Sequence, residues 1–334
     1  MIYADQRWIG DHGIGRFARQ VLSTLEYTPV PLKSHPASAL DAWRLSRALS
    51  NAGREDIIFS PGYNPPLFCA ASFVFTLHDL NHIDRPENSS RLKRLYYATV
   101  MKRSCRKAAR ILTVSEFTRR RIVDWSGVRP EKVVNVGCGV SPEFHPEGAA
   151  FSLPFPYLLC VSNRKHHKNE FRTVEAFAQA RMDAEVRLVF TGNPTQELLN
   201  CIERCHLAQR VCFVGSVPDA ELPSLYRSAA ALVFASLYEG FGLPVLEAMA
   251  CGTPVVTSNT SSLPEIAGDA ALLVDPNSVD EIALGMDRIL NDTSLRNKLR
   301  SKGLERAAHF TWEMTTANVH RVLREVAIEQ HGKR

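Results

Sequence analysis

The chain has 334 residues, which is enough for two domains of ordinary size. Hydrophobic residues make up 45% and charged residues 22%, a composition that excludes a disordered or fibrous protein. No apolar stretch approaches the roughly 20 residues that cross a bilayer, and the first residues lack the pattern of a signal peptide. We therefore expect a folded protein of the cytoplasm.

The net charge of +5 is unevenly distributed. From Arg91 to Arg121 the chain holds eleven lysine or arginine residues against one acid, Glu116. Such clustering suits an anionic partner, either nucleic acid or an anionic membrane, or it serves solubility alone. No helix-turn-helix, zinc or stacking-aromatic motif accompanies the charge, so we expect no nucleic-acid partner.

Short apolar runs with the length of buried strands alternate with helical patterns. In the first half of the chain, the expected strands are 56–60, 73–77, 110–114 and 132–136. The helical patterns lie near 14–25, 38–51, 89–109 and 116–126. Continuous apolar strands joined by helices indicate parallel sheets that are covered on both faces.

The segment 10–18 precedes the first helix, and Gly13 and Gly15 belong to a G-x-G-x-x-A pattern in it. A dinucleotide site is one interpretation. Such a site needs an acid about 20 residues further on, where this chain has Lys33. The alternative is a glycine loop that lets another ligand approach the backbone.

His78 and Asp79 directly follow the expected strand 73–77. A neutral imidazole at a strand end could bind a sugar hydroxyl, and Asp79 could orient the ring. A histidine with a purely structural role is the alternative.

The helix expected near 89–109 is amphipathic and basic. Its apolar face consists of Leu92, Leu95, Tyr96, Thr99 and Val100. A helix of this kind can lie on an anionic membrane, or its apolar face can pack on its own sheet.

Four prolines between 142 and 156 indicate a linker, and we place the two domains at 1–150 and 151–311. In the second half, the expected strands are 157–161, 186–190, 211–214, 231–234, 254–257 and 271–274. The expected helices are 169–181, 195–206, 219–228, 244–251, 278–291, 293–309 and 312–329. The fold class is α/β, with two Rossmann-like parallel sheets facing across a cleft that holds ligands beyond the carboxyl ends of the strands.

Arg164 and Lys168 lie in the loop after the strand 157–161. A guanidinium fork and an ammonium at a strand end suit a diphosphate, whereas the alternative is a solvated basic loop. His166 and His167 suggest a metal, but no carboxylate cluster is spaced with them and no Asp-x-Asp occurs. We therefore expect no metal site.

The segment Glu239-Gly-Phe-Gly-Leu-Pro-Val-Leu-Glu247 has the pattern of a loop that enters a helix. The amides of Phe241, Gly242 and Leu243, together with the positive end of the helix dipole, would face an anion, most simply a phosphate. Glu239 and Glu247 would repel a phosphate unless they bind something else. Sugar hydroxyls are the natural candidates.

This segment resembles the signature of retaining glycosyltransferases of family 4, which have the GT-B fold. The resemblance continues through 254–258, 261–265 and 270–276, and it is weaker in the N-terminal half. It implies that Glu239 contacts the donor hexose, that Glu247 contacts the ribose, and that His78 touches the transferred sugar.

The same resemblance assigns the donor diphosphate to Arg164 and Lys168. It places Gly13 and Gly15 in a loop that closes over the donor phosphate and the acceptor. It further implies that a last helix, about 312–330, crosses back to the first domain. The chain departs from the family pattern at Ser162-Asn163, where many relatives have a glycine, and at His166, where proline is common.

The resemblance implies a retaining, metal-independent hexosyltransferase without a cofactor. Relatives with the Arg-Lys-x-His-Lys-Asn pattern of 164–169 use GDP-mannose or a related GDP sugar for bacterial surface polysaccharides. We expect the same donor, a lipid-linked or saccharide acceptor, and peripheral contact with an anionic membrane through 91–121. Alternatives are a UDP-sugar donor, a non-catalytic GT-B scaffold and a nucleotide-sugar epimerase of similar fold.

Overall fold

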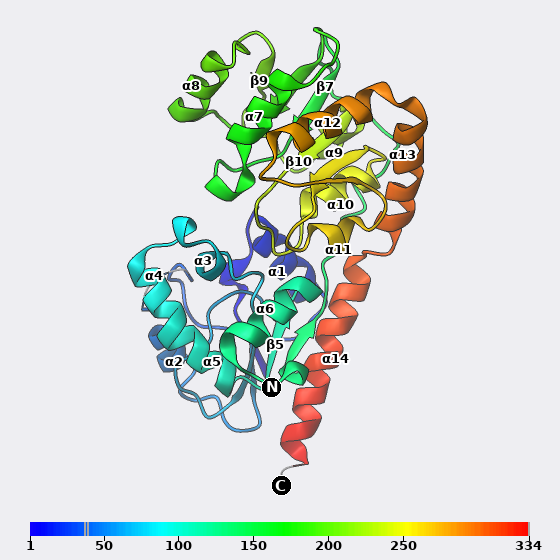
Figure 1. Cartoon of the computed structure of the whole chain (residues 1–334). Helices are drawn as coiled ribbons and strands as arrows, with labels where there is room; N and C mark the ends of the chain where they lie inside the picture. Colours follow the sequence, from blue (N-terminus) through cyan, green and yellow to red (C-terminus); the bar gives the residue numbers. More distant parts are fainter. Residues whose placement is uncertain (37, 39, 333–334) are drawn as a thin grey trace. The chain divides into compact units, whose positions relative to one another are not determined.

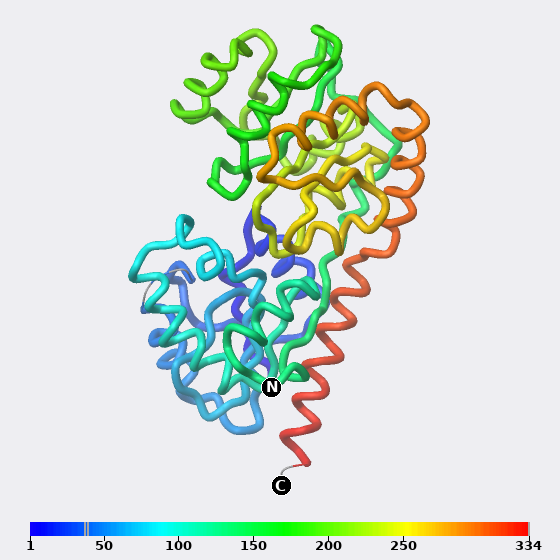
Figure 2. Tube along the Cα trace, viewed as in Figure 1, coloured from blue at the N-terminus to red at the C-terminus, as the bar shows by residue number. Residues whose placement is uncertain are grey.

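The computed structural model describes residues 1–36, 38 and 40–332 (Figure 1). The chain forms two compact units. The first contains Met1–Gly139 and the segment from Thr311 onward, and the second contains Val140–Phe310. The chain therefore passes between the units twice, as its trace in Figure 2 shows.

The first unit is built on a six-stranded parallel sheet in the order β2-β1-β3-β4-β5-β6. Its strands are β1 (Ile2–Ala4), β2 (Thr28–Pro29), β3 (Ile57–Ser60), β4 (Ser72–Thr76), β5 (Arg110–Thr113) and β6 (Val133–Asn135). The four strands expected from apolar runs are confirmed. The order reverses at β1 and β3, and ligands of doubly wound sheets bind at such a switch point.

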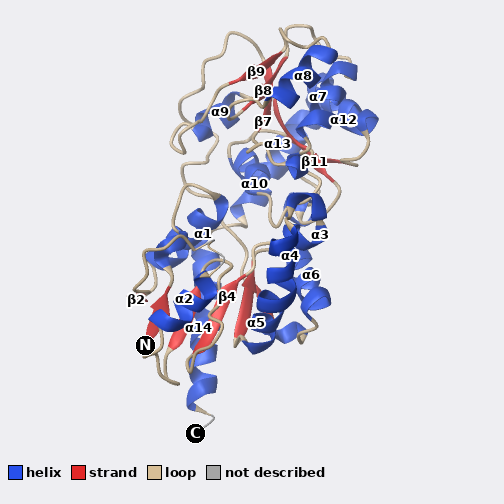
Figure 3. Ribbon diagram, turned by 90° about the vertical axis from the view of Figure 1, so that its left-hand side faces the viewer, coloured by secondary structure: helices blue, strands red, loops and turns tan. Residues whose placement is uncertain are grey.

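Helices lie beside the strands in Figure 3. In the first unit they are α1 (Gly13–Ser23), α2 (Asp41–Ala48), α3 (Asn81–Asp84), α4 (Arg91–Tyr96), α5 (Lys102–Lys107), α6 (Glu116–Ser126) and α14 (Trp312–His331). The helix expected at 38–51 corresponds to α2, and residue 39 lies outside the described residues. The last helix, α14, packs on α1, β3 and β5, and so belongs to the first unit.

The basic helix expected at 89–109 differs from its predicted form. A π-helical turn, Tyr97–Met101, separates α4 from α5. The extra residue in this turn rotates the helix, so that Tyr97 and Met101 are buried. Leu92 and Leu95, on the predicted apolar face, are 80% and 59% exposed. That face does not pack on the sheet at these two positions.

The second unit has a parallel sheet in the Rossmann order, β12-β11-β10-β7-β8-β9. Its strands are β7 (Tyr157–Cys160), β8 (Arg187–Phe190), β9 (Val211–Phe213), β10 (Ala231–Phe234), β11 (Val255–Ser258) and β12 (Leu272–Val274). Its helices are α7 (Glu170–Gln179), α8 (Gln196–Arg204), α9 (Leu222–Ser228), α10 (Leu243–Ala250), α11 (Leu263–Ala267), α12 (Val279–Asn291) and α13 (Thr293–Ala308). All six expected strands are present, and the order reverses at β7 and β10.

The proline-rich segment belongs to the second unit, so the first unit ends at Gly139 rather than at residue 150. The backbone amide of Phe151 donates to the hydroxyl of Ser228 at 2.7 Å. Arg227 donates to the carbonyl oxygen of Ala149 at 2.9 Å. These bonds tie the segment to α9. Proline content indicated a linker, but it could not show which unit the linker packs on.

Candidate functional site

The switch point of the second sheet brings together two predicted site residues. The loop after β7 carries Lys168, and the loop after β10 carries Glu239. The ammonium of Lys168 lies 2.7 Å from Glu239 Oε1, and both side chains are 13% exposed. Neighbouring strands whose connections run in opposite directions leave a crevice at their carboxyl ends, which explains this pairing across 71 positions.

Lys168 is held in place by the residue that follows it. The 3-10 helix His166–Lys168 ends at Asn169, which has a left-handed φ of 61°. The side-chain amide of Asn169 donates to the carbonyl oxygens of Ala235 and Pro276, at 2.9 and 2.7 Å. The Lys168 ammonium also lies over the ring of Phe234, 4.8 Å from its centroid.

The predicted glycine loop enters α10 as the sequence indicated. Gly242 has a φ of +114°, and a Cβ there would lie 2.7 Å from Leu263. No side chain caps the amino end of α10, which begins at Leu243. The Phe241 ring packs edge-on against Phe310, with centroids 6.0 Å apart. The loop therefore turns its backbone, rather than a large side chain, toward the helix end, where an anion is favoured.

Two serines from the loop after β11 fix this backbone. The amide of Glu239 donates to the hydroxyl of Ser261 at 3.1 Å. The hydroxyl of Ser262 lies 2.7 Å from the carbonyl oxygen of Phe241 and donates to it. No role was predicted for either serine. They follow the expected strand 254–257. The rule that ligands bind beyond the carboxyl ends of parallel strands would therefore have identified them.

Glu247 lies in α10 and is only 3% exposed. The hydroxyl of Tyr226, on α9, donates to Glu247 Oε2 at 2.8 Å. The structure thus gives the predicted ribose ligand a buried hydrogen-bond partner that sequence reasoning missed. The tyrosine lies in an ordinary helical pattern 21 positions away, which left no signal.

Among the described residues, Arg164 forms no hydrogen bond with Lys168 or Glu239 and has other partners. Its guanidinium donates to the Glu170 carboxylate and to the carbonyl oxygens of Gly192 (3.1 Å) and Asn193 (2.8 Å). It also lies beside the stacked rings of Phe190 and Phe213, 5.3 Å from each centroid. The guanidinium is therefore engaged by the protein itself, and joint binding of one diphosphate by Arg164 and Lys168 stays a prediction.

His78, at the carboxyl end of β4, is buried in the first unit. Its Nε2 lies 2.8 Å from the carbonyl oxygen of Pro61. A carbonyl only accepts, so Nε2 carries the hydrogen and Nδ1 is an acceptor in the neutral ring. Burial lowers the pKa of His78 to about 4, with a partial opposing effect from Pro61 and Asp79. The ring is therefore neutral at physiological pH.

Asp79 does not orient the His78 ring by a hydrogen bond, contrary to our expectation. Asp79 Oδ1 accepts from the backbone amide of Asn81 at 3.2 Å, at the start of α3. The carbonyl of Pro61 holds the ring instead. The sequence could not reveal this, because Pro61 follows a different strand, β3.

The predicted glycine pair lies at the start of α1. Gly13 is the first residue of the helix, and the side chain of His12 accepts from the amide of Gly15 at 3.0 Å. A Cβ on Gly15 would lie 2.3 Å from the carbonyl oxygen of Gly10. The packing of the loop on itself therefore already requires glycine at this position.

An aromatic residue, Trp8, lies at the switch point of the first unit's sheet, between β1 and β3. Trp8 ends a 3-10 helix, Gln6–Trp8, that directly follows β1. Arg7 fixes this helix through ion pairs of 2.7 Å with the buried carboxylates of Asp5 and Asp41. Trp8 is 7% exposed, and its indole nitrogen is buried without a hydrogen-bond partner among the described residues. Sequence reasoning missed Trp8, which stands in a short polar turn.

In the part of the chain that the structure describes, no group of three or more His, Cys, Asp or Glu side chains could hold a metal ion. Metal independence nevertheless stays a prediction. Within the same described ranges, no helix combines the length and apolar character needed to cross a membrane.

Comparisons with known proteins agree with this architecture. A family model described as "Glycosyl transferases group 1" matches residues 143–306, and one described as "Glycosyltransferase Family 4" matches residues 9–144. O-antigen chain mannosyltransferase B of Escherichia coli is 35% identical over 257 residues, which cover 73% of this chain and 68% of that protein. The serotype-specific mannosyltransferase WbdA of Escherichia coli is 28% identical over 63% of this chain, which spans only 28% of WbdA.

Among solved structures, Anabaena HepE in complex with UDP and glucose has a TM-score of 0.75. It is 18% identical, and the match covers 97% of this chain and 99% of HepE. At this identity the likeness shows the fold, two parallel-sheet units of the GT-B type. The chain belongs to family 4 of the glycosyltransferases.

Proposed function

We propose that this glycosyltransferase moves mannose from GDP-mannose to a hydroxyl of a growing surface polysaccharide. The observation that carries the proposal is the Lys168–Glu239 pair at the switch point, beside the uncapped amino end of α10. The name of the Escherichia coli relative, O-antigen chain mannosyltransferase B, supports mannose and the polysaccharide acceptor.

Lys168 and the amides of Phe241, Gly242 and Leu243 hold the donor diphosphate. Before the donor arrives, Lys168 and Glu239 are each other's partner inside a largely covered crevice. When the diphosphate takes the ammonium, Glu239 is released to accept hydrogen bonds from the hexose. Positive charge fixed at the leaving group stabilises the negative charge that develops as the glycosidic bond breaks.

Arg164 has a positioning role in this proposal. Its bonds to Glu170 and to the loop after β8 fix the segment that carries Lys168. Glu247 binds the ribose, in an orientation that Tyr226 fixes.

In the first unit, His78 accepts a hydrogen bond from a sugar hydroxyl through Nδ1. The buried indole N–H of Trp8 donates to an oxygen of the saccharide acceptor. Gly13 and Gly15 shape the loop next to them. The reaction is retaining and metal-independent, with departure and attack on one face of the sugar, as the resemblance to family 4 implies.

The acceptor is lipid-linked, and α4 contacts the anionic membrane. The exposed side chains of Leu92 and Leu95 lie beside the exposed Arg91 and Arg94 on this helix. Arg119 and Arg121 contribute little to this contact, because they are paired with Glu116 and Asp84.

Thermal stabilisation by nucleotides tests the donor, because a ligand raises the melting temperature in proportion to its affinity. We expect GDP to stabilise the protein more than UDP or ADP, and GDP-mannose to support transfer in the presence of EDTA. Stronger stabilisation by UDP, the nucleotide bound to HepE, would refute the GDP-mannose assignment. Strict dependence on added Mg²⁺ or Mn²⁺ would refute metal independence.

A further inference from the structure

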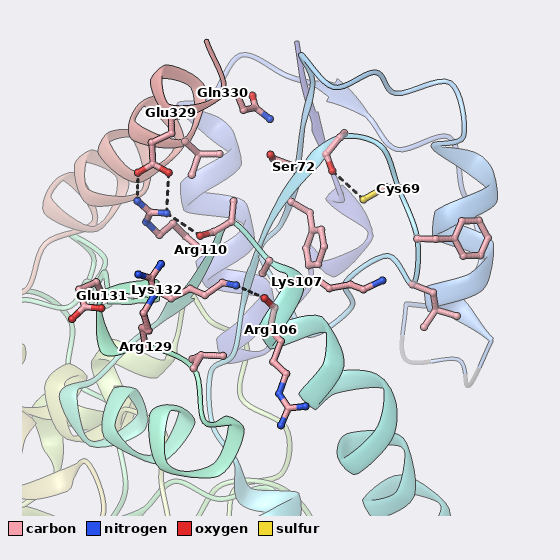
Figure 4. A pocket seen from close by; sticks show the side chains of 18 of the residues that line it. Cys69, Ser72, Arg106, Lys107, Arg110, Arg129, Glu131, Lys132, Glu329 and Gln330 are labelled. Carbon is pink, nitrogen blue, oxygen red and sulfur yellow. Dashed lines mark hydrogen bonds and ion pairs between the residues drawn. The ribbon is translucent and has the colours of Figure 1, made fainter. Parts of the chain in front are cut away.

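A pocket lies at the amino edge of the first unit's sheet, the edge opposite to His78 (Figure 4). Its volume is about 1060 Å³, slightly above the roughly 300–1,000 Å³ of most ligand sites. Its walls are the first residues of β4 and β5, the loops after α5 and α6, and the last turns of α14. The 5 residues of β4 separate the two edges by about 15 Å. The pocket is therefore distinct from the site described above.

The lining carries an excess of positive charge. Five cations and two acids contribute: Arg106, Lys107, Arg110, Arg129, Lys132, Glu131 and Glu329. Part of the excess of three has a structural cause. The carboxyl ends of α5, α6 and α14 meet here, and each helix end contributes about −0.5 charge, or about −1.5 together. About half of the excess remains without a structural cause.

Two of the cations are committed to the protein, as the dashed lines in Figure 4 show. Arg110 binds both carboxylate oxygens of Glu329, and the Lys132 ammonium donates to the backbone carbonyl of Arg106. The side chains of three others, Arg106, Lys107 and Arg129, form no hydrogen bond or ion pair with any described residue. Three exposed, unpaired cations around one hollow concentrate an anion more strongly than cations on a flat surface.

A buried acceptor points to a second group on the ligand. The side-chain nitrogen of Gln330 donates to the carbonyl oxygen of Asp56 at 3.3 Å, which fixes the orientation of the amide. Its oxygen is buried and lacks a hydrogen-bond partner among the described residues. An unsatisfied buried acceptor is unfavourable, because it has lost its hydrogen bonds to water. A hydroxyl donor on a bound molecule would satisfy it.

We propose that this pocket binds a phosphorylated polyol. The phosphate lies against Arg106, Lys107 and Arg129, and a hydroxyl of the polyol donates to Gln330. Near pH 7 its phosphate carries about −1.5 to −2 charge as a monoester, or about −1 as the diester of a lipid headgroup, and so opposes the remaining excess. Two sources share this chemistry: the glycerol-phosphate headgroup of an anionic lipid, and a free sugar phosphate.

Titration calorimetry at about 10 mM salt, where charge is weakly screened, tests the proposal. The probes are glycerol 3-phosphate, glucose 6-phosphate, glucose and inorganic phosphate, and vesicles of phosphatidylglycerol or phosphatidylcholine. We expect saturable binding of a phosphorylated probe or phosphatidylglycerol, and no binding of glucose. Reversing both Lys107→Glu and Arg129→Glu should weaken binding about tenfold or more.

Arg103→Glu is the matched control. Arg103 lies on α5 together with Lys107, is exposed, and does not line the pocket. It should change affinity by less than about twofold, since only screened long-range charge is lost. Gln330→Leu should weaken binding of the phosphorylated polyol more than binding of inorganic phosphate.

Binding of the soluble probes, with vesicle sedimentation that Lys107→Glu/Arg129→Glu leaves unchanged, identifies a free sugar phosphate. Sedimentation with phosphatidylglycerol that Lys107→Glu/Arg129→Glu weakens, and Arg103→Glu does not, identifies a lipid headgroup, because the contact proposed for α4 is intact in both variants. Equal losses from the double reversal and the control, or no binding of any phosphorylated probe, would overturn the pocket assignment. Each variant's affinity for GDP is measured in parallel, so that a defect in folding or in the donor site is recognised separately.

Discussion

The two switch points of this glycosyltransferase use different chemistry. In the second unit, the crevice between β7 and β10 holds an ion pair, Lys168 with Glu239, beside an uncapped helix end. In the first unit, the corresponding edge holds a neutral His78 among the rings of Phe17 and Tyr63, with centroids 5.0 and 5.8 Å away. One edge suits a charged diphosphate and the other suits neutral sugar hydroxyls.

This difference also explains how each edge is stabilised. Charges at the second switch point are partly paired with one another, so a ligand must exchange with an existing partner. At the first switch point the charged residues, Arg7 with Asp5 and Asp41, are buried and paired with one another, and they fix the backbone. The comparison predicts that charge substitutions at the two edges have different effects, which can be measured.

The largest expected effect concerns Arg164, for which we propose a positioning role. Arg164→Ala leaves the Glu170 carboxylate, 8% exposed, without its partner. Removing one member of a buried pair costs about 3–5 kcal/mol of stability. Urea unfolding should show this loss, and the double variant Arg164→Ala/Glu170→Ala should recover part of it. If Arg164→Ala leaves stability unchanged and weakens GDP binding as much as Lys168→Ala does, Arg164 is a diphosphate ligand instead.

Lys168 is expected to act on catalysis more than on folding. Lys168→Ala should lower kcat/KM for the donor about 100- to 1000-fold, as loss of a preorganised charge at the leaving group does. Glu239→Ala should chiefly lower kcat. The loss in the double variant should be smaller than the product of the two single losses, because the residues are coupled. Steady-state kinetics of the four proteins checks this, and wild-type turnover of Glu239→Ala would remove Glu239 from the site.

His78 provides a pH test of the neutral edge. Its pKa in the folded protein, about 4, lies below its ordinary value of 6.5, so the unfolded chain binds the additional proton between these two pH values. Stability should therefore be complete above pH 6.5 and fall as the pH decreases toward 4, by up to about 3 kcal/mol.

Unfolding of the wild type and of His78→Gln, compared from pH 7 to pH 4.5, isolates this contribution. The His78→Gln protein should lack that part of the decrease in stability. An NMR titration in which the His78 ring becomes protonated near pH 6.5 would contradict a buried neutral imidazole.

The sequence predicted most of the fold for a physical reason. All ten strands expected from apolar runs are present, because buried parallel strands need continuous apolar side chains. The two additional strands, β1 and β2, were not predicted; β1 has three residues, and β2 has two, one of which is a proline. Lys168, Glu239 and His78 were predictable because each follows an expected strand, and ligands bind beyond the carboxyl ends of parallel strands.

Side-chain partners were not predictable in this way. Arg164 and Lys168 lie four positions apart, and sequence proximity suggested a joint role, yet Arg164 contacts the loop after β8 and Lys168 the loop after β10. Tyr226 and Pro61 contact site residues only through the fold, since each comes from a separate element. Local spacing indicates which residues lie in a loop, whereas the tertiary contacts decide where each side chain points.

Trp8 gives the smallest expected effect and the sharpest test of the acceptor edge. Trp8→Phe removes the indole N–H but retains an aromatic ring, so packing against Tyr63, 6.0 Å away between centroids, is largely kept. If the buried N–H donates to the saccharide acceptor, the variant loses one hydrogen bond, about 1 kcal/mol, or roughly fivefold. KM for the acceptor should rise by that factor, while kcat and KM for the donor stay unchanged. Because this N–H has no partner among the described residues, its loss should not lower the free energy of unfolding. An equal rise in donor and acceptor KM would mean that the substitution disturbs the whole unit, and an unchanged acceptor KM would leave Trp8 with a packing role only.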